Sequence, residues 1–178
     1  MMPKYYFLLF CLIPFISCSQ NKAEAGKNRL EAPIIKQNFT SLQFETDGKP
    51  CIASINDRYI GFKEKSIYSL SLFIIVNTLE KDRNGHPTEK EALFFNTFQT
   101  QILKELSASI GNYCYVGTTA MSGYRDILLY IKPEHQEMAT SIVQKFKIEQ
   151  NRVESISFEN DPEWEAVSSF YEATTLKN

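Results

Sequence analysis

The chain has 178 residues, with 21 acidic and 19 basic side chains and a formal charge of −2. No basic run stands out from this balance, so the sequence does not predict nucleic-acid binding through a positively charged patch. The only histidines are His86 and His135, and neither has the spacing to a second ligand that a helical metal site needs, so we predict no metal and no other cofactor.

The first eighteen residues have the layout of an export signal. Lys4 precedes an apolar run over residues 5–16, which is too short to span a bilayer comfortably, and the small residue Ser17 follows. The segment Phe15-Ile16-Ser17-Cys18 resembles a bacterial lipobox, in which the cysteine takes a lipid and becomes the first residue of the mature protein. We therefore predict a lipoprotein signal peptide over residues 1–17 and lipid attachment at Cys18. A plain signal peptide cut elsewhere and an uncleaved anchor helix are the alternatives.

Lipidation implies a protein of the cell envelope, attached to one leaflet of a membrane and facing the periplasm or the surface. Residues 18–38 are polar and small, with no sustained periodicity, and we predict a flexible tether there. A flexible tether of this length has a root-mean-square span of roughly 25 Å. About 140 residues, 39–178, then remain for a single folded domain.

Two cysteines, Cys51 and Cys114, remain in that domain. An oxidising compartment permits a disulfide between them, while two buried free thiols are the other interpretation.

The domain is predicted to begin with a β-hairpin. Residues 40–45 and 51–56 have strand composition and flank an Asp47-Gly48 turn signal. Residues 68–77 alternate at first and then become apolar on both faces, which favours a central strand.

A helix is predicted to follow. Thr88 and Glu91 form a capping-box pattern, large apolar residues then recur every three or four positions, and Gly111 supplies a stop.

A second hairpin is predicted over residues 113–121 and 124–132. Pro133 suits the start of a second helix, in which Met138, Ile142 and Phe146 would face the sheet.

Residues 153–158 are predicted to form the last strand. Asp161-Pro162 then combines a cap with a first-turn proline, and Trp164, Val167 and Tyr171 give a closing helix its apolar side.

From residue 68 onward the predicted order is strand, helix, strand, strand, helix, strand. This order is typical of an α+β, ferredoxin-like βαββαβ sandwich. We expect the N-terminal hairpin at one edge of the sheet and the C-terminal helix as an addition. Thr118 and Thr119 beside Gly117 are predicted to mark a bulge or a close backbone approach, and ligand binding is the alternative.

Several short motifs occur in a suggestive order: Asp47-Gly48-Lys49-Pro50, Asn84-Gly85-His86-Pro87-Thr88-Glu89, Val116-Gly117-Thr118-Thr119 with Gly123-Tyr124-Arg125, and Asp161-Pro162-Glu163-Trp164 with Phe170-Tyr171. In order and spacing they resemble the bacterial domain of unknown function 695 family, from about Phe39 to Tyr171. More distantly, the ending and the element order look like the regulator of ribonuclease activity B, which implies a protein-binding use of the fold. Neither resemblance implies a catalytic residue.

Arg125 stands out because it begins an otherwise apolar strand, next to Asp126. An arginine fork can clamp a carboxylate or a phosphate, so we consider Arg125 and Asp126 candidate contacts to a ligand or partner. The alternative is an ion pair with a carboxylate such as Glu91 or Glu163. Trp164, the only tryptophan, is either a recognition surface or a core residue.

The sequence contains no nucleophile motif, and we name no catalytic residue. The function that we predict is a lipid-anchored binding or interaction module whose partner is an envelope protein or a small ligand. A small hydrolase of envelope material, using acidic residues near residues 84–91, is the alternative. The oligomeric state is left open.

Overall fold

The structure is a computed structural model that describes residues 38–83, 85–121 and 123–177. This part of the chain is α+β, with six strands in one antiparallel sheet of order β1-β2-β4-β5-β3-β6. The strands are β1 (Phe39–Thr46), β2 (Lys49–Asn56), β3 (Leu70–Asn77), β4 (Cys114–Met121), β5 (Tyr124–Ile131) and β6 (Val153–Asn160), and the α-helices are α1 (Glu89–Ile110), α2 (Gln136–Gln150) and α3 (Ser168–Lys177). The predicted signal peptide, Cys18 and all but the last residue of the predicted tether lie outside the described residues.

None of the helices in the described ranges is long and apolar enough to cross a membrane.

The predicted N-terminal hairpin is confirmed. Thr46 pairs with Lys49 and leaves Asp47 and Gly48 as a two-residue turn. Their φ angles of 53° and 70° are positive, as the preferred hairpin turn requires. Because β2 also pairs with β4, the hairpin forms one edge of the sheet.

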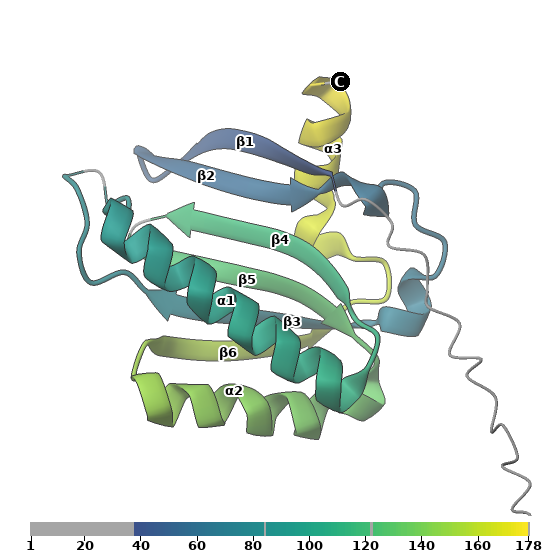
Figure 1. Cartoon of the computed structure of the whole chain (residues 1–178). Coiled ribbons are helices and arrows are strands. Elements are labelled where there is room, and N and C mark those ends of the chain that lie inside the picture. Colours follow the sequence, from purple (N-terminus) through teal and green to yellow (C-terminus); the bar gives the residue numbers. More distant parts are fainter. Residues whose placement is uncertain (1–37, 84, 122, 178) are drawn as a thin grey trace, which may run out of the picture. The chain divides into compact units, whose positions relative to one another are not determined.

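Helices α1 and α2 lie together over one face of the sheet (Figure 1). The backbone N–H of Glu91 donates to the Thr88 hydroxyl at 3.4 Å, and α1 ends at Gly111 with a φ of 71°. Both predicted ends of α1 are therefore confirmed. The core under these helices is formed by buried aliphatic and aromatic side chains, among them Leu72, Ile74, Phe95, Phe98, Ile102, Leu129, Ile142 and Phe146.

The predicted inner face of α2 is partly wrong. Pro133 begins a short 3-10 turn and α2 begins at Gln136. Met138 is 51% exposed, whereas Ala139 and Val143 are buried. A spacing of four residues advances about 40° past a full turn, so two such steps carry Met138 about 80° away from Phe146 around the helix.

Helix α3 packs over the other face, against β1 and β2 (Figure 1). Trp164, Val167 and Tyr171 are buried there, as predicted. Asp161 caps the segment by accepting from the backbone N–H groups of Glu165 and Ala166.

The start of the last helix differs from the prediction. Trp164 has a left-handed backbone and precedes a 3-10 turn, so α3 begins only at Ser168 and Pro162 is not a first-turn proline.

Strand β4 contains the predicted irregularity, a β-bulge between Tyr115 and Gly117. A Cβ added to Gly117 would lie 2.1 Å from the carbonyl oxygen of Ser54 on β2, so this close approach requires glycine. The bulge adds one residue, and Tyr115 and Thr118 consequently line the same cleft although they are three positions apart.

Candidate functional site

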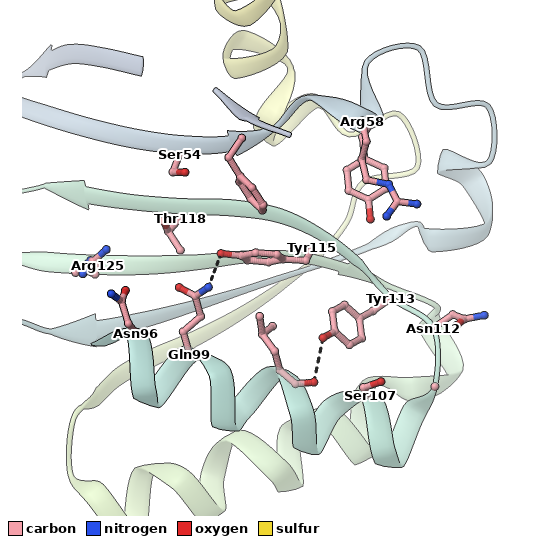
Figure 2. A pocket seen from close by; sticks show the side chains of 14 residues that line it. Ser54, Arg58, Asn96, Gln99, Ser107, Asn112, Tyr113, Tyr115, Thr118 and Arg125 are labelled. Atoms are coloured by element: carbon pink, nitrogen blue, oxygen red, sulfur yellow. Dashed lines mark hydrogen bonds between the residues drawn. The ribbon is translucent and has the colours of Figure 1, made fainter. Parts of the chain in front are cut away.

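A cleft of about 590 Å³ lies between α1 and neighbouring strands (Figure 2). This volume is within the range of ligand pockets, roughly 300–1,000 Å³. The lining residues come from β1, β2 and the turn after it, α1, the turn before β4, β4 itself and the start of β5: Phe39, Ser54, Arg58, Tyr59, Asn96, Gln99, Leu103, Ser107, Gly111, Asn112, Tyr113, Tyr115, Thr118 and Arg125.

The charge of this lining differs from that of the whole chain. Arg58 and Arg125 are basic, and none of the described residues that line the cleft is acidic, although acidic residues outnumber basic ones overall. Most of the other lining side chains are neutral and polar. The cleft is therefore suited to a ligand that carries negative charge.

Arg125 is the second residue of β5 and lies at one end of the cleft (Figure 2). Its Cζ is 3.7 Å from the centre of the Phe95 ring on α1. Its Nε is buried and has no hydrogen-bond partner in the structure, and Arg125 forms no ion pair with any described residue. Burial lowers the pKa of the guanidinium, an effect that Tyr115 partly offsets, but arginine remains charged in proteins.

A second arginine in this fold, Arg152, has both hydrogen-bond and ion-pair partners. The Cζ of Arg152 lies 4.0 Å from the Phe94 ring. Its Nε and Nη2 both donate to the carbonyl oxygen of Asn77, at 3.2 and 2.8 Å, and its guanidinium forms an ion pair with Glu91. Since the Glu91 carboxylate already forms an ion pair with Arg152, it is not the partner of Arg125.

Glu163, the other suggested partner of Arg125, is exposed. Its carbonyl oxygen accepts from Lys65. The ion pair that was the alternative role for Arg125 does not form among the described residues.

Two hydrogen bonds fix the α1 wall against β4. Gln99 Nε2 donates to the Tyr115 hydroxyl oxygen at 2.8 Å, and the Tyr113 hydroxyl donates to the carbonyl oxygen of Leu103 at 3.0 Å. Burial raises the pKa of Tyr115, and Arg125 and Thr118 only partly oppose that rise. Tyr115 is therefore a neutral phenol that can position a ligand and does not serve as a base near neutral pH.

Asp126 lies on the other face of the sheet from Arg125, because successive strand residues alternate. The Thr119 hydroxyl donates to its carboxylate, and both residues are buried. Burial raises the pKa of Asp126, and the Thr119 hydrogen bond partly offsets the shift. Of the two adjacent candidates, only Arg125 lines the cleft.

Trp164 is a core residue in this structure. Its side chain is 0% exposed. The indole stacks on Tyr130 with ring centres 4.2 Å apart, and its Nε1 donates to the carbonyl oxygen of Tyr68 at 2.9 Å. Trp164 is thus not accessible to a ligand or partner.

Cys51 and Cys114 are buried free thiols in the structure. The register between β2 and β4 pairs Ile52 with Ala120 and Ile55 with Gly117. It therefore places the two cysteines about 20 Å apart along the strands, far beyond disulfide reach. Burial raises the pKa of the Cys114 thiol to about 12, which makes it unreactive at neutral pH.

Acidic residues around the loop before α1 have partners within the fold. Glu80 pairs with Lys90, and Glu91 pairs with Arg152 and accepts from the backbone N–H of Leu79. Asp82 accepts from the backbone N–H of His86. In the described ranges no group of three or more His, Cys, Asp or Glu side chains could hold a metal ion.

The sequence did not point to the α1 side of the cleft. Asn96 and Gln99 are neutral, three positions apart, and lie beside the buried stripe that contains Phe95. Most of the other exposed residues of α1 are also neutral, so the sequence contains no local signal that distinguishes Asn96 and Gln99 as cleft residues.

A family model described as a family of unknown function (DUF695) matches residues 37–171. The match covers every segment that lines the cleft. No curated protein and no solved structure gives a significant match to the chain.

Proposed function

The chain belongs to the DUF695 family, whose function is unknown, and from the cleft of this member we propose that it is a binding module that holds a carboxylate-bearing ligand through Arg125. The observation that carries the proposal is the buried Nε of Arg125, which has no hydrogen-bond partner. Buried polar groups in proteins almost always have partners, and their absence calls for an explanation. A bound carboxylate supplies one.

The chemistry of the guanidinium favours this ligand. A carboxylate can accept two parallel hydrogen bonds from one edge of an arginine, and such charge-assisted pairs are short and strong. Stacking on Phe95 holds the guanidinium plane in position before the ligand arrives. Less conformational entropy is then lost on binding.

A phosphate is a poorer match than a carboxylate. Phosphate sites in proteins commonly combine several cations with backbone N–H groups at a helix N-terminus. Here the residues that line the cleft from α1 begin at Asn96, well after the helix start at Glu89, and a single guanidinium lies at this end.

Binding fits the cleft better than catalysis does. The described lining residues include no Asp, Glu, His or Cys, so a general acid or base that titrates near neutral pH is missing from the part of the wall that is described. The tyrosines Tyr59, Tyr113 and Tyr115 have pKa values that burial raises.

The proposed place of action is the cell envelope. The charged start, the short apolar run and the lipobox-like segment ending at Cys18 support lipid attachment. The intact mass of the membrane-extracted protein tests this directly. We expect a chain that begins at Cys18 and carries acyl mass, whereas an unlipidated chain would rule out the anchor.

We also propose that β3, α1, β4, β5, α2 and β6 form a ferredoxin-like unit, to which the β1-β2 hairpin and α3 are added. The partial strand order β4-β5-β3-β6 and the position of α1 and α2 on one face support it. An experimental structure with a different strand order would contradict the assignment.

Calorimetric titration of the purified protein with small carboxylates, such as propionate and succinate, tests the binding proposal. We expect saturable binding, and we expect the Arg125→Gln variant to have an affinity at least tenfold lower. The matched control is Arg83→Gln, which removes the same charge from an exposed position outside the cleft. Equal affinity in wild type and Arg125→Gln would overturn the proposal.

A further inference from the structure

Resting on the proposed function, we infer that the carboxylate held by Arg125 belongs to an acidic saccharide, meaning one sugar ring or a short chain of rings that bears a carboxylate and free hydroxyls. The cleft is larger than a simple carboxylate needs. The chemical groups of the other lining residues indicate which groups the rest of the ligand carries.

Amide and hydroxyl groups dominate that lining. They come from both walls and from the turn between them: Ser54, Asn96, Gln99, Ser107, Asn112 and Thr118. Each can donate and accept hydrogen bonds. Sugar hydroxyls have the same dual character, so a saccharide can satisfy many of these groups at once.

The two ends of the cleft differ in what they attract. Arg125 lies at one end, and Arg58 and Asn112 lie at the other, where α1 ends (Figure 2). The last carbonyl groups of a helix have no intrahelical partners and carry partial negative charge, so this end favours hydrogen-bond donors. With Arg58 there and no acidic residue in the described lining, a ligand ammonium is disfavoured and neutral hydroxyl donors fit best.

A peptide is a weaker candidate because β2 and β4, on the sheet side of the cleft, are each paired on both sides. The unpaired edge of the sheet nearest the cleft is the outer edge of β1, which contributes only Phe39 to the lining. Recognition by strand addition needs an unpaired edge. The lining therefore favours a ligand that is recognised by side chains, as saccharides are.

The apolar part of the lining also suits a sugar ring. Phe39 and Tyr115 lie with ring centres 5.7 Å apart at an angle of 50°, and both line the cleft. Aromatic faces carry partial negative charge and attract the C–H groups of a sugar ring.

The test compares oligosaccharides of galacturonate and glucuronate with a neutral galactose oligosaccharide, trialanine and propionate, all by calorimetric titration of the purified protein. We expect at least one acidic oligosaccharide to bind tenfold or more tighter than the neutral sugar, trialanine and propionate. Arg125→Gln should weaken this binding at least tenfold. Asn96→Ala, which alters an exposed side chain on α1, should weaken saccharide binding severalfold. Arg83→Gln, which lies outside the cleft, should leave the binding of both saccharide and propionate unchanged.

The outcomes separate the two proposals. If trialanine or propionate binds through Arg125 as tightly as either acidic saccharide, the saccharide inference is overturned and the carboxylate site stands. If no carboxylate binds, both fail. If Arg125→Gln does not fold, Arg125→Lys replaces it, because lysine keeps the charge but lacks the two parallel N–H donors of the guanidinium. Unchanged saccharide affinity in Arg125→Lys would also overturn the inference.

Discussion

The guanidinium of Arg125 lies 3.7 Å from the centre of the Phe95 ring while its Nε has no hydrogen-bond partner in the structure. The stack contributes about 0.5–2 kcal/mol, but it uses the face of the guanidinium and leaves its edge free. Arg125 therefore lacks the partner that a structural ion pair would provide. Arg152 stacks on Phe94, the residue before Phe95, but its Nε and Nη2 both have partners.

Replacing Arg125 by Met should change the free energy of unfolding by no more than about 1 kcal/mol. The lost stacking is offset because a buried donor without a partner is removed. Urea unfolding measures the change. A loss above about 3 kcal/mol would show that Arg125 is mainly structural.

Glu91→Gln should destabilise the fold by about 3 kcal/mol, because the charge of Arg152 then lies buried without a counterion. The two side chains are only 7% and 11% exposed. Urea unfolding of the variant gives the value. The double variant Glu91→Leu with Arg152→Met removes both charges. If it recovers most of the lost unfolding free energy, the unpaired charge is the cause. If it is less stable than Glu91→Gln, the explanation is contradicted.

Gly117→Ala should destabilise the fold by about 2–4 kcal/mol, because its Cβ would lie 2.1 Å from the Ser54 carbonyl oxygen and β2 and β4 would have to separate. Gly48→Ala is the control, since its Cβ meets nothing within 4 Å. Its positive φ alone should cost about 1 kcal/mol. Equal losses for the two variants, measured by thermal unfolding, would argue against the close approach.

Asp126→Asn should stabilise the protein at pH 7 by about 1 kcal/mol. Burial raises the pKa of Asp126 in the folded chain above its ordinary value of 3.8. The stability that this carboxyl contributes is therefore full below about pH 3.8 and is lost as the pH rises through the folded-state pKa. Asparagine does not ionise and still accepts from Thr119.

The gain from Asp126→Asn should therefore shrink as the pH falls toward 3.8. Urea unfolding of both proteins across this pH range provides the comparison. A variant that is less stable than wild type at pH 7 would show that the ionised carboxylate stabilises the fold.

Local signals explain why much of the fold could be predicted from the sequence. Asp47 and Gly48 adopt the positive φ angles of a tight turn, and Thr88 and Gly111 bound α1, because each of these features depends on residues a few positions apart. The orientation of α2 was harder to predict. Its buried stripe runs through Ala139 and Val143, and small residues such as alanine give a weak hydrophobic signal.

The site was only partly predictable. Arg125 is recognisable in the sequence as a charge near the start of an apolar strand, and strand alternation places Asp126 on the other face. The hydrogen bond between Gln99 and Tyr115 depends on how α1 crosses the sheet and on the bulge beside Gly117. Both are long-range consequences of packing that no local pattern encodes.

The proposed function depends most on whether the unpartnered Nε–H edge of Arg125 binds a carboxylate. Nuclear magnetic resonance of the arginine Nε–H groups, during titration with galacturonate oligosaccharides, observes that edge directly, and Arg152 serves as an internal control because its Nε already donates to Asn77. The predicted result is a saturable shift of the Arg125 Nε–H signal to a hydrogen-bonded position, with the Arg152 signal unchanged. An Arg125 signal that does not move at any ligand concentration would contradict the account.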